Sequence, residues 1–341
     1  MFDLPLDQLQ TYQPDIPVPD DLTSFWSETL DEARSHDLAV RRAPYANKLA
    51  LIETDDLNYA GFGGTPVKAW LHRPAGARGP LPTVVQFHGY SGGRGFPHST
   101  TTWAQAGYAH LVMDTRGQGW QTTAGGPSGT PDLTPDAGMN HAPGWMTAGI
   151  TDPRTYFYRR VYTDAVRLLD VAGTLPEVDR SRIAVAGVSQ GGGIAIAAAG
   201  LAALSGIELA GAAPDVPFLC HFRRAVEITD RQPYAEITRY LSGWRDHAEQ
   251  AYATLAYFDG AVLGRLATAP ALFSVALMDP ICPPSTVFAA YHAYGADAAT
   301  VPAKKEIRIY PHNEHEGGGP YQVDAQLSWF ADRFADRRTD G

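Results

Sequence analysis

Short apolar runs alternate with longer amphipathic stretches along most of this chain. From residue 81 onward, runs rich in β-branched and small apolar residues predict strands, and the stretches between them have the spacing of helices. The predicted strands are residues 83–87, 110–113, 183–186, 207–212, 271–277 and 306–310. The predicted helices are residues 99–106, 158–172, 285–294 and 321–334. This alternation predicts an α/β protein, in which a mostly parallel twisted sheet carries helices on both faces.

Before residue 81 the pattern differs. Residues 1–18 are punctuated by prolines and predict an extended arm. A helix that ends near Arg34 follows, with Asp20 or Asp21 as its N-cap and an aromatic face that docks on the rest of the domain. A hairpin comes next, because two apolar runs are joined by a glycine-rich turn. Its strands are residues 50–59 and 66–72.

Two segments interrupt the alternation of strands and helices. Residues 121–151 are rich in Gly, Pro, Thr and Asp, and a connection of this length is usually functional or disordered. Residues 234–263 are aromatic and helical in pattern, which suits a cap over a site or an interface. We therefore expect one domain over residues 1–341, with an N-terminal arm and helix over about residues 1–40 and these two inserted segments.

One turn carries the pattern of a catalytic nucleophile. Gly187-Val188-Ser189-Gln190-Gly191 joins a predicted strand to a helix of small residues. In such a nucleophile elbow, glycines on both sides of the serine let the strand and the helix approach closely. The hydroxyl is pushed out above the sheet, and the helix aims free N–H groups at an oxyanion there. A glycine-rich turn with an incidental serine has the same five residues, so the assignment depends on partners elsewhere in the chain.

The partners that a nucleophilic serine needs are a histidine that takes its proton and a carboxylate that holds the histidine. In the α/β-hydrolase fold the order along the chain is serine, acid, histidine. Asp279 directly follows a predicted strand, and His315 follows the last one. Asp215 follows the strand after the elbow and is the competing acid, but a position one strand later is the commoner one. We predict a triad of Ser189, Asp279 and His315, with Asp215 as a structural or pocket carboxylate.

The loop of the predicted base contains a second histidine. His312 lies closer to the end of the strand, and we expect it to support the site or to lie at the surface. The spacing His312-x-x-His315, with Glu314 and Glu316 beside it, also invites comparison with a metal site. It is not the H-E-x-x-H pattern, and no third ligand is suggested. We predict neither a metal nor a cofactor.

Two glycine-rich loops complete the candidate site. An oxyanion hole in this fold takes one main-chain N–H from the residue after the nucleophile, here Gln190, and one from the loop after an early strand. That loop has glycines around Tyr90, which let the main chain approach an acyl oxygen, so Tyr90 is the predicted second donor. Arg116-Gly117-Gln118 follows the next predicted strand, and its guanidinium has enough donors to tie neighbouring loops together.

Composition and charge narrow the choice of partners. The formal net charge of −10, without any long basic run, argues against nucleic acid or a membrane surface as a partner. Cys220 and Cys282 are the only cysteines, so no disulfide framework is implied and a reducing compartment is the simpler assumption. The first residues lack the basic and apolar regions of a secretory signal, and no run reaches transmembrane length. We expect a cytoplasmic protein that acts on a small molecule.

Several of these motifs together resemble one enzyme family. Arg116-Gly117-Gln118, the elbow around Ser189 and the pair His315-Glu316 are similar to the signature of carbohydrate esterase family seven, the acetyl xylan esterases and cephalosporin-C deacetylases. The likeness covers essentially the full chain. Further stretches that resemble family sequence are residues 87–90, 144–146, 158–162, 215–219 and 282–288.

The resemblance implies a function and an assembly. It implies a serine esterase that removes acetyl groups from acetylated xylo-oligosaccharides, cephalosporin C and similar small esters without a cofactor. It implies Ser189 as nucleophile, Asp279 as acid and His315 as base, with Tyr90 and Gln190 at the oxyanion hole. It also implies a homohexamer whose sites face an enclosed interior. The alternatives are a serine peptidase of the prolyl-oligopeptidase kind, which usually carries a large additional domain, and an inactive hydrolase fold that serves as a binding module.

Overall fold

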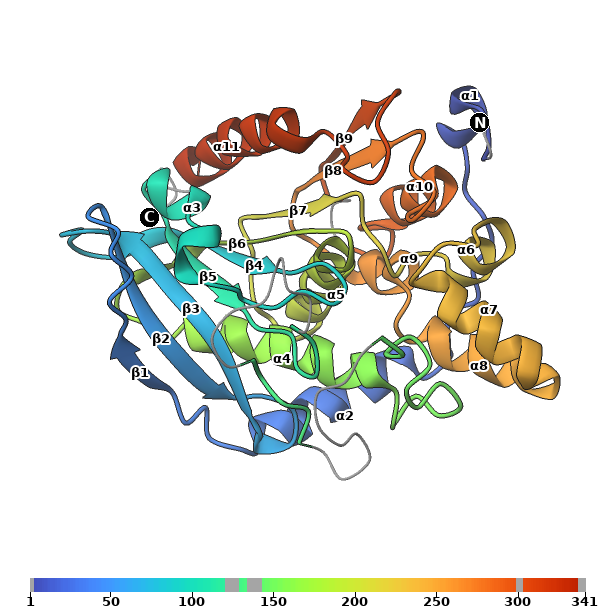
Figure 1. Cartoon of the computed structure of the whole chain (residues 1–341), viewed down its shortest axis with the longest axis horizontal. Helices are drawn as coiled ribbons and strands as arrows, with labels where there is room; N and C mark the ends of the chain where they lie inside the picture. The colour runs from blue at the N-terminus through green and yellow to red at the C-terminus, as the bar shows by residue number, and fades with distance from the viewer. Residues whose placement is uncertain (1–2, 120–128, 134–142, 299–302, 337–341) are drawn as a thin grey trace.

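The computed structural model describes residues 3–119, 129–133, 143–298 and 303–336 (Figure 1). Within these residues the strands are β1 (Arg41–Pro44), β2 (Ile52–Ala60), β3 (Pro66–Pro74), β4 (Leu81–Phe87), β5 (Ala109–Met113), β6 (Val178–Val188), β7 (Gly211–Asp215), β8 (Ala271–Ala276) and β9 (Lys305–Tyr310). The helices are α1 (Leu6–Leu9), α2 (Leu22–Arg34), α3 (Thr102–Gln105), α4 (Phe157–Ala172), α5 (Gln190–Leu204), α6 (Phe222–Ile228), α7 (Tyr234–Gly243), α8 (Ala248–Ala256), α9 (Gly260–Leu263), α10 (Pro284–Ala293) and α11 (Gly319–Asp336).

All of these strands belong to one sheet. Their order is β1-β2-β3-β5-β4-β6-β7-β8-β9. Within this order, β5, β4, β6, β7, β8 and β9 are parallel to one another. The pairs β1–β2, β2–β3 and β3–β5 are antiparallel. The predictions of a mostly parallel sheet and of an N-terminal hairpin are therefore confirmed.

Helices cover both faces of the sheet, as the alternation of strands and helices predicts (Figure 1). Val85 and Val185 on the central strands belong to the large core that includes the buried residues of α2, α4 and α5. Their neighbours Val84 and Ala184 point to the other face, where they meet aromatic residues of α3 and α11. Successive residues of a strand face opposite sides, so apolar runs without polar alternation mark strands that are buried on both faces.

The parallel strands end together at one edge of the sheet. Phe87 pairs with Gly187, and Val188 pairs with Asp215, so the ends of β4, β6 and β7 are level. At the last pair of strands, Ala276 lies opposite Tyr310. The loops after these strands and the first residue of α5, Gln190, include every predicted site residue except the Arg116 motif, which follows β5 at the same edge.

Some predicted boundaries are wrong. The strand predicted at residues 207–212 begins at Gly211 and continues to Asp215. Pro214-Asp215 has the composition of a turn, but pairing with β6 keeps both residues in the strand. The arm predicted as extended contains the single turn α1, and the helix predicted at residues 99–106 is only the four-residue α3. Strand β1 and helix α6 are absent from the prediction, because both are short and the exposed β1 has no apolar alternation.

The two interrupting segments have different outcomes. Most of residues 121–151 lie outside the described residues. Residues 234–263 form α7, α8 and α9, which agrees with their helical pattern. Figure 1 shows α6, α7 and α8 at the opposite end of the molecule from β1. Among the helices described, none has the length and apolarity needed to cross a bilayer.

Candidate active site

Ser189 lies in a sharp turn between β6 and α5. Its φ angle is 58°, a left-handed conformation that few residues other than glycine adopt. The glycines on either side are required, because a Cβ on Gly187 would overlap the main chain of Gly191 and a Cβ on Gly191 would overlap the carbonyl of Phe87. The main-chain N–H of Ser189 donates to the carbonyl of Asp215 at 2.9 Å, which anchors the turn to β7.

The three residues predicted as a triad lie in hydrogen-bond contact. Nε2 of His315 is 3.0 Å from Oγ of Ser189, and Nδ1 is 2.9 Å from Oδ2 of Asp279. The Asp279 carboxylate is buried, and its other oxygen accepts the main-chain N–H groups of Ile281 and Cys282. A carboxylate beside Nδ1 favours the proton on that nitrogen, which leaves Nε2 to accept the proton of the serine hydroxyl.

The loop that carries the histidine is shaped by its own polar groups. Glu316 accepts hydrogen bonds from the Asn313 side chain and the Glu314 main chain. The bond from Asn313 is the main cause of the lowered pKa of the Glu316 carboxyl. Glu316 is exposed, so water screens its charge interaction with His315, and its hydrogen bonds act on the shape of the loop. His312 is also exposed, on the surface side of the same loop.

The structure does not group His312 with other potential metal ligands. In the part of the chain that is described, the ligand atoms that come together are those of Asp279, Cys282 and His315, within 4.8 Å of one another. Asp279 and His315 already bind each other, and burial raises the pKa of the Cys282 thiol well above its usual range. The neutral thiol is a poor ligand.

The two predicted oxyanion donors lie on loops that one glutamine links. Neither the Tyr90 nor the Gln190 main-chain N–H donates to another described residue. The Gln118 side chain accepts the Ser91 N–H at 2.9 Å and donates to the Gln190 side chain at 2.9 Å. Gln190 also accepts from the Tyr158 hydroxyl at 2.8 Å. The Arg-Gly-Gln motif therefore sets the distance between the loop after β4 and the start of α5.

The arginine of this motif forms a buried ionic network. Arg116 is fully buried and donates through two nitrogens to Asp164 on α4. A third nitrogen lies 3.4 Å from Asp132, which also accepts from Arg160 at 2.8 Å. Paired hydrogen bonds of this kind offset the free-energy cost of burying the charged guanidinium. Arg116 thus holds the loop after β5 against α4.

Glu236 on α7 is a site residue that the sequence analysis missed. Its carboxylate accepts the Tyr90 hydroxyl at 2.6 Å and the main-chain N–H of Met146 at 3.2 Å. Burial, and then the charge of Glu236, raise the pKa of Tyr90. The only signal in the sequence is the aromatic, helical character of residues 234–263, which does not single out one glutamate.

Comparison with known proteins agrees with this geometry. The family model described as acetyl xylan esterase (AXE1) matches residues 1–333. The chain belongs to the acetyl xylan esterase family. The predicted resemblance and the α/β-hydrolase fold class are thereby confirmed.

Solved structures of this family are similar over nearly the whole chain. The acetyl xylan esterase from Paenibacillus sp. R4 is 39% identical, with a TM-score of 0.86 and coverage of 96% of this chain and 99% of the other. Acetyl xylan esterase 1 from Thermoanaerobacterium sp. JW/SL YS485 is 30% identical, with a TM-score of 0.85 and coverage of 97% and 99%. Acetyl esterase Axe7A of Xylanibacter ruminicola is 26% identical over 319 residues, which are 87% of this chain and 63% of that protein. The chain thus spans less than two thirds of the length of this curated relative.

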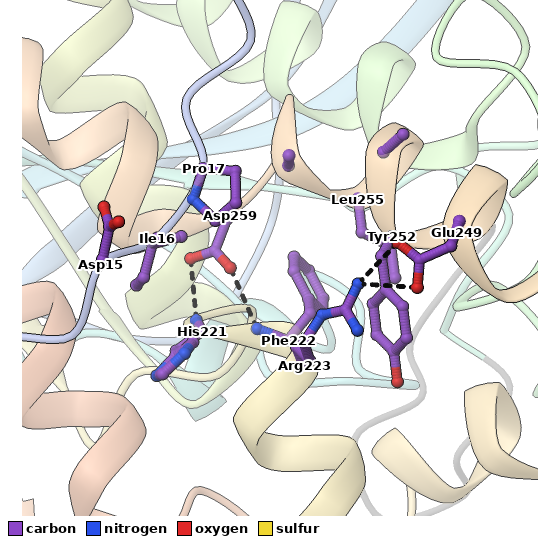
Figure 2. A pocket seen from close by; sticks show the side chains of 12 residues that line it. Asp15, Ile16, Pro17, His221, Phe222, Arg223, Glu249, Tyr252, Leu255 and Asp259 are labelled. Carbon is purple, nitrogen blue, oxygen red and sulfur yellow. Dashed lines mark hydrogen bonds and ion pairs between the residues drawn. The ribbon is translucent and has the colours of Figure 1, made fainter.

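This family member also has a pocket that lies away from the triad (Figure 2). It has a volume of about 260 Å³ and lies between the N-terminal arm, α6 and α8. None of Ser189, Asp279 and His315 lines it. Asp259 lines one wall, where its carboxylate accepts the main-chain N–H groups of His221 and Phe222. This carboxylate joins the start of α6 to the start of α9.

Proposed function

We propose that this chain is a serine carboxylesterase that removes acetyl groups from acetylated xylo-oligosaccharides and similar small acetyl esters. The observation that carries the proposal is the continuous line of contacts from Ser189 through His315 to Asp279. Membership of the acetyl xylan esterase family supports the acetyl group as the acyl part of the substrate.

The reaction is a two-step acyl transfer. Oγ of Ser189 forms a bond to the acetyl carbonyl carbon while Nε2 of His315 takes the hydroxyl proton. The oxyanion accepts the main-chain N–H groups of Tyr90 and Gln190, and the buried Asp279 stabilises the imidazolium. The tetrahedral intermediate then expels the alcohol, which receives the proton from His315. Water attacks the acetyl-enzyme in the same manner, and acetate and free Ser189 are the products.

The nucleophile is tested by substitution. Ser189→Ala should lower kcat for a chromogenic acetate ester by at least about 10³-fold. The remaining rate is what the oxyanion hole and substrate binding supply without a nucleophile. Ser242→Ala is the matched control, because this exposed serine of α7 bonds, among the described residues, only to the nearby carbonyl of Arg239. Labelling by an organophosphonate should occur in the parent protein and in Ser242→Ala, and not in Ser189→Ala. Activity that survives in Ser189→Ala contradicts the assignment.

The acyl and alcohol parts of the substrate need separate assays. Acetate esters should be hydrolysed faster than butyrate and longer esters, and a preference for long chains would indicate a lipase-like pocket instead. A panel of acetylated xylose, acetylated xylobiose and cephalosporin C then ranks the alcohol parts. Cleavage of a dipeptidyl amide faster than any acetate ester would favour a peptidase.

We further propose a homohexamer in the cytoplasm. The resemblance to carbohydrate esterase family seven supports the hexamer. Sedimentation equilibrium of the full chain measures it directly, and a monomer at micromolar concentration would contradict it. Cys220 and Cys282 are both free thiols, which suits a reducing compartment.

A further inference from the structure

Asp215 is a buried carboxylate that touches every segment of the triad. It is the last residue of β7, and only 5% of it is exposed. Its main-chain carbonyl accepts the Ser189 N–H at 2.9 Å. Its backbone therefore holds the nucleophile in the strained turn between β6 and α5.

The side chain of Asp215 contacts the segments that carry the other two triad residues. Oδ1 accepts the hydroxyl of Ser274, on the strand that leads to Asp279. It also lies against the loop of the base, because a Cβ on Gly317 would stand 3.4 Å from it. Gly317 has a φ angle of 59° and follows His315 by two residues, so the loop passes close to the carboxylate.

Burial and these neighbours act in opposite directions on the ionisation of Asp215. Burial raises the pKa of its carboxyl to about 6, while the Ser274 hydroxyl and His315 act in the opposite direction. Among the titratable groups described, His315 is the one whose charge acts on Asp215. Ser274 from β8 and Gly317 from the base loop are uncharged neighbours. A proton on the imidazole is therefore near three carboxylates: Asp279 in contact with it, Asp215 against the loop of the base, and the exposed Glu316 of that loop, which also interacts with His315 by charge.

We propose that Asp215 is a positioning residue of the triad, whose carboxylate stabilises the His315 imidazolium and retains part of that stabilisation when Asp279 is absent. This inference rests on the proposed function, in which the imidazolium forms as Ser189 attacks. It differs from the assignment of Asp279 as the acid, because Asp215 acts by charge without a hydrogen bond to the imidazole. A carboxylate near a cation in a buried site interacts much more strongly than in water.

A double-mutant cycle tests the proposal. Asp279→Ala is the better partner than Asp279→Asn, because the amide oxygen would stay on the N–H groups of Ile281 and Cys282 and turn the NH₂ toward His315, which fixes the wrong tautomer. We expect Asp215→Asn alone to lower kcat by about 3- to 10-fold at unchanged KM. In this variant the acid limb of the kcat/KM profile should move to lower pH, because the protonated imidazole no longer has the attraction of the Asp215 carboxylate.

The cycle is decided by the double variant. In the Asp279→Ala background, Asp215→Asn should lower kcat by a further factor of more than about 10, which exceeds its effect in the parent enzyme. Ser274→Ala provides a second route, because loss of its hydroxyl raises the pKa of Asp215. In the Asp279→Ala background, Ser274→Ala should lower activity at a pH near the pKa of Asp215. About two pH units above that pKa, activity should be unchanged, because Asp215 is ionised in both proteins.

Asp259→Asn is the matched control. Burial also raises the pKa of the Asp259 carboxyl to about 6, but its partners are main-chain N–H groups and no triad residue acts on it. It should leave the pH profile in place. The proposal is overturned if the double variant equals Asp279→Ala, or if Asp259→Asn moves the acid limb as Asp215→Asn does. An inactive parent enzyme, or an active Ser189→Ala variant, would instead overturn the proposed function.

Discussion

Gln118→Ala should weaken the oxyanion hole without touching the nucleophile. The Gln118 side chain makes one hydrogen bond to Ser91 and exchanges two with the side chain of Gln190. Alanine removes all three. Among the described residues, the Ser91 N–H is then a buried donor without an acceptor, and the Gln190 side chain retains the His88 carbonyl and the Tyr158 hydroxyl.

The size of the effect follows from these lost contacts. An unsatisfied buried donor costs about 1–3 kcal/mol, and each neutral hydrogen bond contributes about 1 kcal/mol. We expect the free energy of unfolding to fall by about 3–5 kcal/mol. Tyr90 precedes Ser91, so the same change should loosen one of the two proposed oxyanion donors. Complete loss of such a donor lowers kcat by about 10²- to 10³-fold, and partial displacement should lower it by about 10- to 100-fold.

The assay separates the two effects. Steady-state hydrolysis of an acetate ester should show a lower kcat at nearly unchanged KM, because the oxyanion exists only after attack. Urea unfolding followed by fluorescence measures the stability change. Gln326→Ala is the control, since it removes another buried glutamine, on α11. A Gln118→Ala enzyme that is destabilised but keeps kcat within about two-fold would refute the proposed link between the loops.

Three further predictions concern the surrounding network. Arg116→Met leaves the buried Asp164 carboxylate without its cation, while Asp132 keeps Arg160, and should lower the free energy of unfolding by about 3–5 kcal/mol, measured in urea. Lysine should not rescue the loss, because it cannot form the paired contacts. Burial lowers the pKa of His72 from 6.5 to about 4, so the unfolded chain binds the proton first and stability should fall as pH decreases from about 6.5 to about 4. His72→Gln should reduce that slope by up to about 1.4 kcal/mol per pH unit in unfolding experiments; an unchanged slope contradicts this assignment. Glu236→Gln keeps an acceptor for the Tyr90 hydroxyl but turns an NH₂ toward the Met146 N–H, and should lower kcat by about 10-fold in the acetate assay.

Local sequence was sufficient for much of the fold. The strands β4, β5, β6, β8 and β9 and the long helices α4, α10 and α11 follow from apolar runs and helical spacing, because burial of a strand or a helix face leaves a period in the sequence. The boundary errors lie where this rule fails. Pro214-Asp215 is part of β7 only because β6 supplies partners for it.

The candidate triad was also visible before the fold. Ser189 sits in a turn where Gly187 is a local steric requirement, since a side chain there would meet the main chain of Gly191, whereas a side chain on Gly191 would meet Phe87 at the end of β4. Asp279 and His315 each follow a strand, and parallel strands place such residues at the same edge of a sheet. Order along the chain therefore predicted which residues meet, although not the contacts of 3.0 Å and 2.9 Å that they make.

The supporting residues depend on the packing of distant segments. Tyr90 and Glu236 are 146 residues apart, and Arg116 and Asp164 are 48 apart. No local period or turn requirement links such pairs, because their contact depends on how α7 and α4 dock against the sheet. The same holds for Asp215, whose side chain meets Ser274 and the loop of His315 only in the folded molecule. The sequence thus determined the order of strands, helices and reactive groups, whereas tertiary packing decided which carboxylates and amides surround them, since those contacts join parts of the chain that local forces do not connect.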